Sequence, residues 1–116
     1  MTRDYAPMLE ALTRLRGVRG AMVVAAGDGV VVAESLMGGL KSTALAALAA
    51  SLATRVADLS AGVGVGAPKF LHLQAAEGSL LVAPGHDDLV LVAVAGKDVP
   101  LGLTRIEMLR MVERLS

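Results

Sequence analysis

The sequence predicts an α+β sandwich in which a five-stranded antiparallel sheet carries one long helix on one face and two terminal helices on the other. Helical periodicity occurs in three separated segments, and short β-branched runs lie between them. Asp-Gly, Glu-Gly and Pro-Gly turns join these runs, and turns this short connect antiparallel strands. The predicted order is αββαβββα. The length favours one domain over residues 1–116.

The N-terminal segment predicts a helix followed by a hairpin. Residues 4–16 place apolar side chains at helical spacing, with Pro7 in the first turn, where its missing N–H costs little. Residues 21–26 and 30–33 are β-branched runs around an Asp-Gly turn, which is typical of a hairpin. Neither run alternates apolar with polar residues, so we expect both faces of the sheet to be covered.

Residues 41–60 predict a long helix with two apolar stripes, separated by about 130° at 100° per residue. A helix that covers only its own sheet needs one such stripe. We therefore expect the leucine-rich stripe to pack on the sheet and the alanine stripe to let another backbone come close. The first stripe is Leu45, Leu48, Leu52, Val56 and Leu59, and the second is Ala46, Ala50, Ala53 and Ala57.

The C-terminal half predicts a three-stranded meander and a final helix. The strands are expected at residues 70–74, 80–83 and 89–94. The apolar residues of the last helix recur at every third position, and we expect them to face the sheet. They are Leu103, Ile106, Leu109 and Val112, widened by Met108, Met111 and Leu115.

Composition excludes several classes of function. Eleven basic and eleven acidic residues cancel, and one Tyr and one Phe are the only aromatic residues, so we expect no nucleic-acid binding. The longest uncharged run is shorter than the about 20 residues that span a bilayer, so we expect no membrane insertion. The charged start of the chain does not resemble a secretory signal, so we expect a cytoplasmic protein.

Two motifs are candidates for sites of chemistry. The glycine-rich segment 62–69 is not a phosphate loop, because Lys69 is followed by Phe70 rather than Ser or Thr. It also follows a helix C-terminus, whose partial negative charge repels phosphate. Residues 86–88, His-Asp-Asp, lack convergent partners and are typical of a polar hairpin loop. We therefore expect no catalytic residue, no cofactor and no metal ion.

Three stretches carry a shared pattern of glycine and apolar residues. They are GVRGAMVV at 17–24 with the turn at 28–29, the alanine-rich helix at 41–59, and residues 70–105, which begin FLHL and end LGLTR. Together these stretches resemble the roadblock domain, the family of the dynein light chain roadblock, the Ragulator subunits and the bacterial MglB regulators. Profilin-like and longin-like domains have similar helices and strands in a related order, so they are the main alternative families.

The resemblance implies a homodimer. In such domains the edge strand of the meander pairs with its copy across a two-fold axis, and the long helices lie antiparallel over the joined sheet. An exposed apolar edge strand is a liability that pairing removes, so the residues themselves point the same way. The expected interface is Ala46, Ala50, Ala53, Ala57, Phe70, Leu71, His72 and Leu73.

The resemblance also implies a non-catalytic regulator or scaffold of a small Ras-like GTPase, including GTPase activation. We expect this partner to dock on the polar sector of the long helix. Two alternatives stay open: a profilin-like or PAS-like sensory module that holds a small molecule between sheet and helix, and a purely structural assembly subunit. Few polar groups lie among the apolar positions, which disfavours the sensory module. The polar sector is Ser51, Thr54, Arg55 and Asp58.

Overall fold

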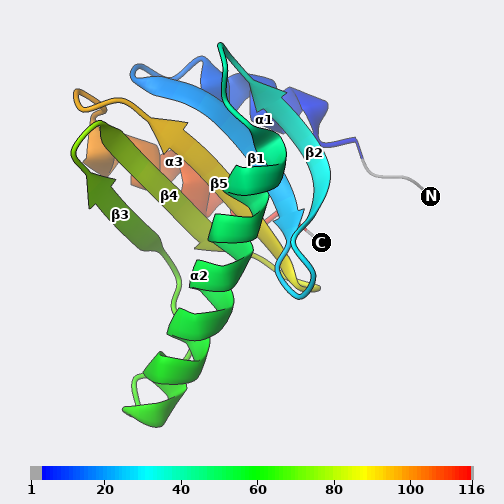
Figure 1. The fold of residues 1–116 in the computed structure, drawn as a ribbon, viewed down its shortest axis with the longest axis vertical. Coiled ribbons are helices and arrows are strands. Elements are labelled where there is room, and N and C mark those ends of the chain that lie inside the picture. Colours follow the sequence, from blue (N-terminus) through cyan, green and yellow to red (C-terminus); the bar gives the residue numbers. More distant parts are fainter. Residues whose placement is uncertain (1–3, 116) are drawn as a thin grey trace.

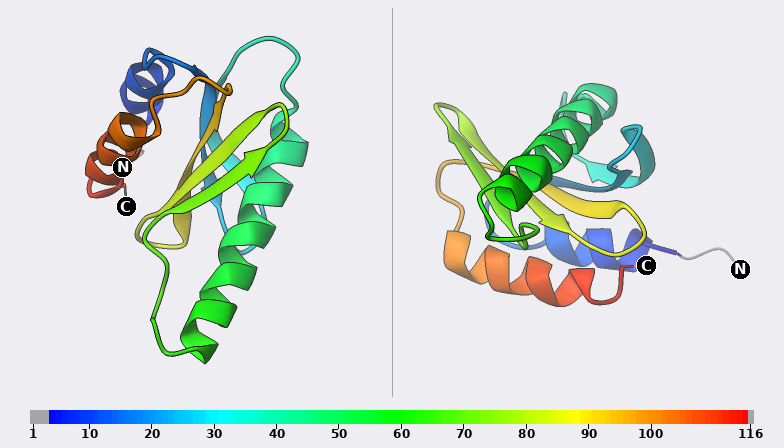
Figure 2. Two further views of the ribbon diagram at one scale, coloured as in Figure 1. Left: turned by 90° about the vertical axis from the view of Figure 1, so that its left-hand side faces the viewer. Right: turned by 90° about the horizontal axis from the view of Figure 1, so that it is seen from below.

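The computed structural model describes residues 4–115 and contains a five-stranded antiparallel sheet with three helices (Figure 1). The elements are α1 (Ala6–Thr13), β1 (Val18–Ala25), β2 (Val30–Leu36), α2 (Ser42–Gly62), β3 (Leu71–Ala75), β4 (Gly78–Pro84), β5 (Leu89–Ala95) and α3 (Leu101–Val112). The strand order across the sheet is β2-β1-β5-β4-β3. Helices α1 and α3 cover one face and α2 covers the other (Figure 2). The predicted fold class is confirmed.

The first helix ends earlier than predicted, and β1 begins earlier. Gly17 turns the chain between them with a φ of +84°, a region that side chains other than glycine rarely adopt. A Cβ at Gly17 would also lie 2.8 Å from the Cα of Val99. The glycine therefore allows β1 to start at Val18, three residues before the expected strand.

Two layers of core fill the space on either side of the sheet. The layer under α1 and α3 contains bulky side chains, whereas the layer under α2 combines the valines of the sheet with small residues of the helix. The interior strand β1 is buried along most of its length, as its unbroken apolar run predicted. The largest buried side chains of the first layer are Leu9, Leu12, Leu81, Leu91, Met108 and Leu115.

The structure reverses the predicted roles of the two stripes on α2. Small side chains let the helix backbone approach the valine-rich face of the sheet closely, and this brings the alanines inward. Leu45 and Leu52 are half-buried and pack against the margin of this core, whereas Leu48 and Leu59 turn outward. Leu48 is 47% exposed and Leu59 is 70% exposed. The buried residues of α2 are Ala46, Ala49, Ala50 and Ala53.

This reversal corrects the predicted interface. Ala46, Ala50 and Ala53 pack against the chain's own sheet, so their side chains cannot contact a second copy. Ala57, the remaining member of the predicted stripe, is half-buried. The predicted orientation of the stripes was wrong because hydropathy ranks leucine above alanine, whereas the close approach of a helix to a sheet favours the smaller side chain. The interface itself stays a prediction.

The buried face of α3 also differs from the prediction. Leu103 and Ile106 are about half exposed, whereas Met108, Val112 and Leu115 are buried as predicted, and Thr104 joins them. The buried residues of the helix are therefore four apart, at Thr104, Met108 and Val112. A three-residue repeat drifts around a helix, whereas a four-residue repeat stays close to one face. Thr104 can be buried because its hydroxyl donates to the carbonyl oxygen of Pro100 at 2.9 Å.

Helix α2 extends well beyond the sheet at its C-terminal end (Figure 2). By length and composition it is apolar enough to cross a membrane, with a mean hydropathy of 1.3, yet only 22% of that stretch is buried. Because the alanine face packs on the sheet, Leu48 and Leu59 leave apolar surface on the outward side. In water this side is expected to need a covering surface.

Candidate interaction surfaces

The two edges of the sheet differ in regularity. Strand β3 forms one edge and pairs with β4 in an unbroken register from Leu71 opposite Val82 to Ala75 opposite Gly78. At the other edge, β2 contains a bulge at Val32, an extra residue in its pairing with β1. Bulges disrupt the ladder and protect an edge from further pairing. Strand β3 is therefore the edge better suited to pairing with another strand (Figure 1).

The structure brings three of the four predicted edge residues together. Leu71, His72 and Leu73 lie in β3, and Leu73 is 41% exposed. The ring Nε2 of His72 lies 3.0 Å from the hydroxyl oxygen of Ser79 on the neighbouring strand. Phe70 precedes the strand and packs against the core under α3, so it lies off the edge.

An apolar groove separates the N-terminal half of α2 from β3 and β4. This α2–β3 groove has a volume of about 500 Å³, and apolar side chains make up most of its lining. Leu73 belongs both to the groove and to the free edge, so the two form one continuous surface. Its apolar side chains include Leu40, Leu45, Leu48, Leu73, Leu80 and Val94.

The predicted polar sector of α2 is exposed at all four positions, Ser51, Thr54, Arg55 and Asp58. Thr54 turns toward the end of β1, where its hydroxyl donates to the carbonyl oxygen of Ala26 at 3.5 Å. The sector therefore lies beside the hairpin turns at one end of the sheet.

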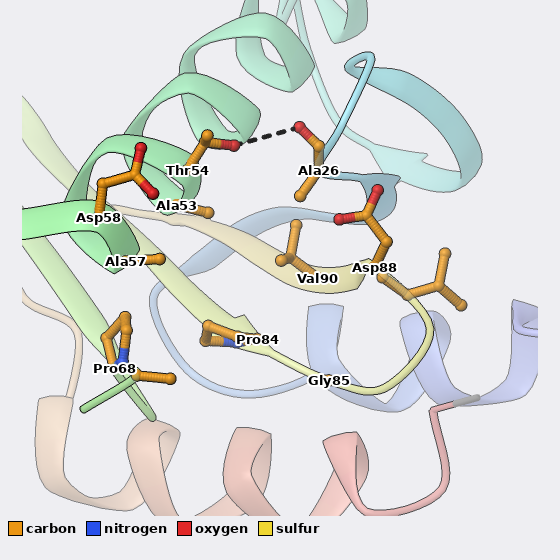
Figure 3. Close-up of a pocket in the computed structure, with 12 residues that line it drawn as sticks. Ala26, Ala53, Thr54, Ala57, Asp58, Pro68, Pro84, Gly85, Asp88 and Val90 are labelled. Atoms are coloured by element: carbon orange, nitrogen blue, oxygen red, sulfur yellow. Dashed lines mark hydrogen bonds between the residues drawn. The ribbon is translucent and has the colours of Figure 1, made fainter. Parts of the chain in front are cut away.

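A second hollow lies there, under the C-terminal half of α2. This α2–turn cavity has a volume of about 290 Å³. Its walls come from α2, from the loop that follows α2, from β4 and from the start of β5 (Figure 3). Two carboxylates, those of Asp58 and Asp88, lie on opposite sides of it. The apolar lining includes Ala53, Ala57, Pro68, Pro84 and Val90.

Asp88 fixes one side of this cavity by joining two hairpins. Its carboxylate accepts the N–H of Gly27 at 2.7 Å, and its carbonyl oxygen accepts the N–H of Ala26 at 2.8 Å. Asp87 and Asp88 both have positive φ, and the N–H of Leu89 donates to the carbonyl of His86, which defines a tight hairpin turn. Residues 86–88 are thus the turn that the sequence predicted.

The sequence did not reveal the contact between Asp88 and Gly27. The two residues are 61 positions apart, and strand register alone brings them together. The sequence held one signal, the glycine at position 27 directly before the Asp-Gly turn. In the structure a Cβ at Gly27 would lie 2.8 Å from the Asp88 carboxylate, so the contact requires a glycine there. Within residues 4–115, no group of three or more His, Cys, Asp or Glu side chains is placed to hold a metal ion.

The fold and these surfaces define a small α+β domain whose prominent surface features are an open strand edge and an outward apolar helix side. Such features belong to domains that act by association. The chain belongs to the Roadblock/LC7 domain family, whose model matches residues 6–95. This confirms the resemblance found in the sequence.

Individual proteins are similar to the chain over most of its length. The chain is 29% identical over 109 residues to the protein MJ1340 of Methanocaldococcus jannaschii, and the match covers 94% of both chains. It is similar to a Roadblock/LC7 domain from Streptomyces avermitilis, with a TM-score of 0.87, 19% identity and coverage of 97% and 94%. It is also similar to an MglB protein solved in a tetrameric arrangement, with a TM-score of 0.85, 25% identity and coverage of 95% and 83%.

Proposed function

We propose that the chain is a homodimeric regulator or scaffold of a small Ras-like GTPase and has no catalytic residues of its own. Roadblock domains are generally non-catalytic regulators, and MglB is among the structural relatives. The observation that carries the proposal is the continuous surface formed by the free edge of β3 and the α2–β3 groove. We further propose that residues 1–116 form one such domain and act in the cytoplasm.

The proposed dimer forms when β3 pairs with its copy across a two-fold axis. A two-fold contact uses the same patch twice, so each side chain that it covers contributes in both copies. Fully burying an exposed leucine contributes roughly 1.5–3 kcal/mol. Because Leu48 and Leu73 are close to half exposed, covering each contributes on the order of 1 kcal/mol per copy. The new ladder of backbone hydrogen bonds sets the register of the contact.

Pairing through β3 places two copies of the polar sector of α2 on one face of the dimer. A Ras-like GTPase that docks there meets exposed polar and charged side chains, including Arg55 and Asp58. Regulation does not require a donated arginine finger, because a docked protein can order the switch loops and water-positioning groups of the GTPase itself. The proposed mechanism is therefore positioning rather than chemistry.

The dimer is tested by charging one edge of the sheet at a time. Leu73→Asp places a carboxylate in the proposed seam, and we expect it to convert a dimer to a monomer in sedimentation velocity at low micromolar concentration. Val32→Asp is the matched control, because Val32 is 46% exposed on the opposite edge and Leu73 is 41% exposed. We expect the control to remain dimeric. A well-folded single copy of the unaltered chain would contradict the proposal.

The partner is tested with a Ras-like GTPase from the same genome, preferably one encoded alongside. We expect the GTP-bound form to co-elute with the unaltered chain, and Arg55→Glu to weaken this association while leaving the dimer intact. Binding that is indifferent to Leu73→Asp would count against a dimeric regulator. A thermal-shift screen with nucleotides and metabolites tests the sensory alternative, which predicts stabilisation by a small molecule.

A further inference from the structure

The α2–turn cavity combines apolar walls with acidic margins. Ala53 and Ala57 of α2 are too small to fill the space between the helix and the end of the sheet. Pro68 and Pro84 form the opposite wall (Figure 3). At about 290 Å³ the cavity lies at the lower limit of the roughly 300–1,000 Å³ of small-molecule sites, so its size suits a single side chain.

The charge of the cavity is unbalanced. Asp58 and Asp88 face it from opposite sides, and neither carboxylate has a cationic partner among residues 4–115. Asp88 is held in place, because one of its oxygens accepts the N–H of Gly27. The cavity therefore presents two negative charges around an apolar interior, and its complement is a positive charge on an apolar stem.

We propose that this cavity receives an arginine side chain from a partner protein. The three methylene groups of arginine would lie against the alanine and proline walls, as the stems of long basic side chains do on apolar surfaces. The planar guanidinium carries five N–H donors in a fixed fork that matches a carboxylate, which a lysine ammonium matches less well. A partner protein is favoured over a free metabolite because Asp58 also belongs to the exposed polar sector of α2.

The test uses the full chain and a small probe, N-acetyl-arginine amide, followed by amide NMR shifts. N-acetyl-citrulline amide is the matched probe, because it has nearly the same shape but no charge. We expect the arginine probe to bind saturably with a millimolar Kd, to shift the amides of Gly27, Thr54 and Leu89, and to weaken as salt is raised. We expect citrulline to bind at least tenfold more weakly.

Two substitutions remove the charges without altering the shape. Asparagine tolerates positive φ, and its amide oxygen still accepts the N–H of Gly27, so Asp88→Asn preserves the link between the hairpins. Asp58→Asn changes an exposed helix position. We expect each to weaken the arginine probe several-fold and the pair to weaken it at least tenfold. Asp87→Asn is the control, because Asp87 has the same backbone conformation but does not line the cavity.

Equal binding of the two probes would overturn the proposal, as would shifts confined to amides other than those of the cavity lining and of Gly27, which bonds to Asp88. An affinity unchanged in the doubly substituted chain would overturn it too. Absence of saturable binding would overturn it as well. The titration needs neither a GTPase nor an intact dimer, so its failure is distinguishable from failure of the proposed function.

Discussion

At the scale of single residues, several positions are fixed by contacts between segments that are distant in the sequence. Gly78 begins β4 directly beside the end of β5, and a Cβ there would lie 2.5 Å from the carbonyl oxygen of Ala95. Both groups belong to paired strands, so neither can move away without breaking the ladder. Gly102 in α3 has open space around the same position.

Gly78→Ala is therefore expected to lower the free energy of unfolding by about 1–3 kcal/mol, the usual cost of overpacking. Gly102→Ala is the matched control and is expected to change it by no more than about 0.5 kcal/mol, because Gly102 lies in the first turn of α3 with open space around it. Urea denaturation at one protein concentration measures both. Equal stability of the two variants would contradict the crowding at Gly78.

Residue contacts were also the least predictable level of the structure. The sequence identified residues 86–88 as a turn from their polarity and the preceding Pro-Gly. It did not show that Asp88 would reach Gly27, because strand register between distant segments determines that contact. Thr104 was likewise missed, since its burial depends on a hydroxyl bond to Pro100 within its own helix rather than on hydropathy.

At the scale of elements, helix α2 shows where sequence patterns succeed and fail. Its existence, its length and its two apolar stripes followed from periodicity. The orientation of the stripes did not, because both satisfy the same helical spacing. Orientation depends on how close the helix can approach the sheet, and the alanine face allows the closer approach.

A pair of substitutions tests this orientation. Ala49→Leu adds volume between α2 and the sheet at a fully buried position, and we expect it to destabilise the fold by about 1–3 kcal/mol. Ala44→Leu makes the same chemical change at an exposed position of the helix and is expected to stay within about 0.5 kcal/mol of the unaltered chain. Alanine and leucine have similar helix propensity, so the difference in Tm between the two variants reports the difference in packing. If Ala49→Leu left the stability unchanged, the orientation predicted from the sequence, with the leucine stripe on the sheet, would be favoured instead.

At the scale of the whole molecule, the proposed dimer links folding to association. If β3 and the α2–β3 groove are covered only in the dimer, mass action stabilises the fold as the protein concentration rises. A tenfold increase adds about 1.4 kcal/mol. For an assembly of this size that corresponds to a rise in Tm of roughly 3–6 °C.

Scanning calorimetry over a hundredfold range of concentration measures this dependence. We expect the unaltered chain to show it and Leu73→Asp to lose it while unfolding at a lower temperature. A Tm independent of concentration in the unaltered chain would indicate that the fold is stable without a second copy to cover the exposed leucines of α2.

The bulge at Val32 has a consequence for the size of the assembly. A sheet with two equally receptive edges can add copies without limit and grow into a fibre. In the proposed dimer the regular β3 edges pair with each other, so the joined sheet would present only the irregular β2 edges to the outside. Such a dimer would end growth by strand addition after one pairing, and the apolar, valine-rich chain would remain a finite particle.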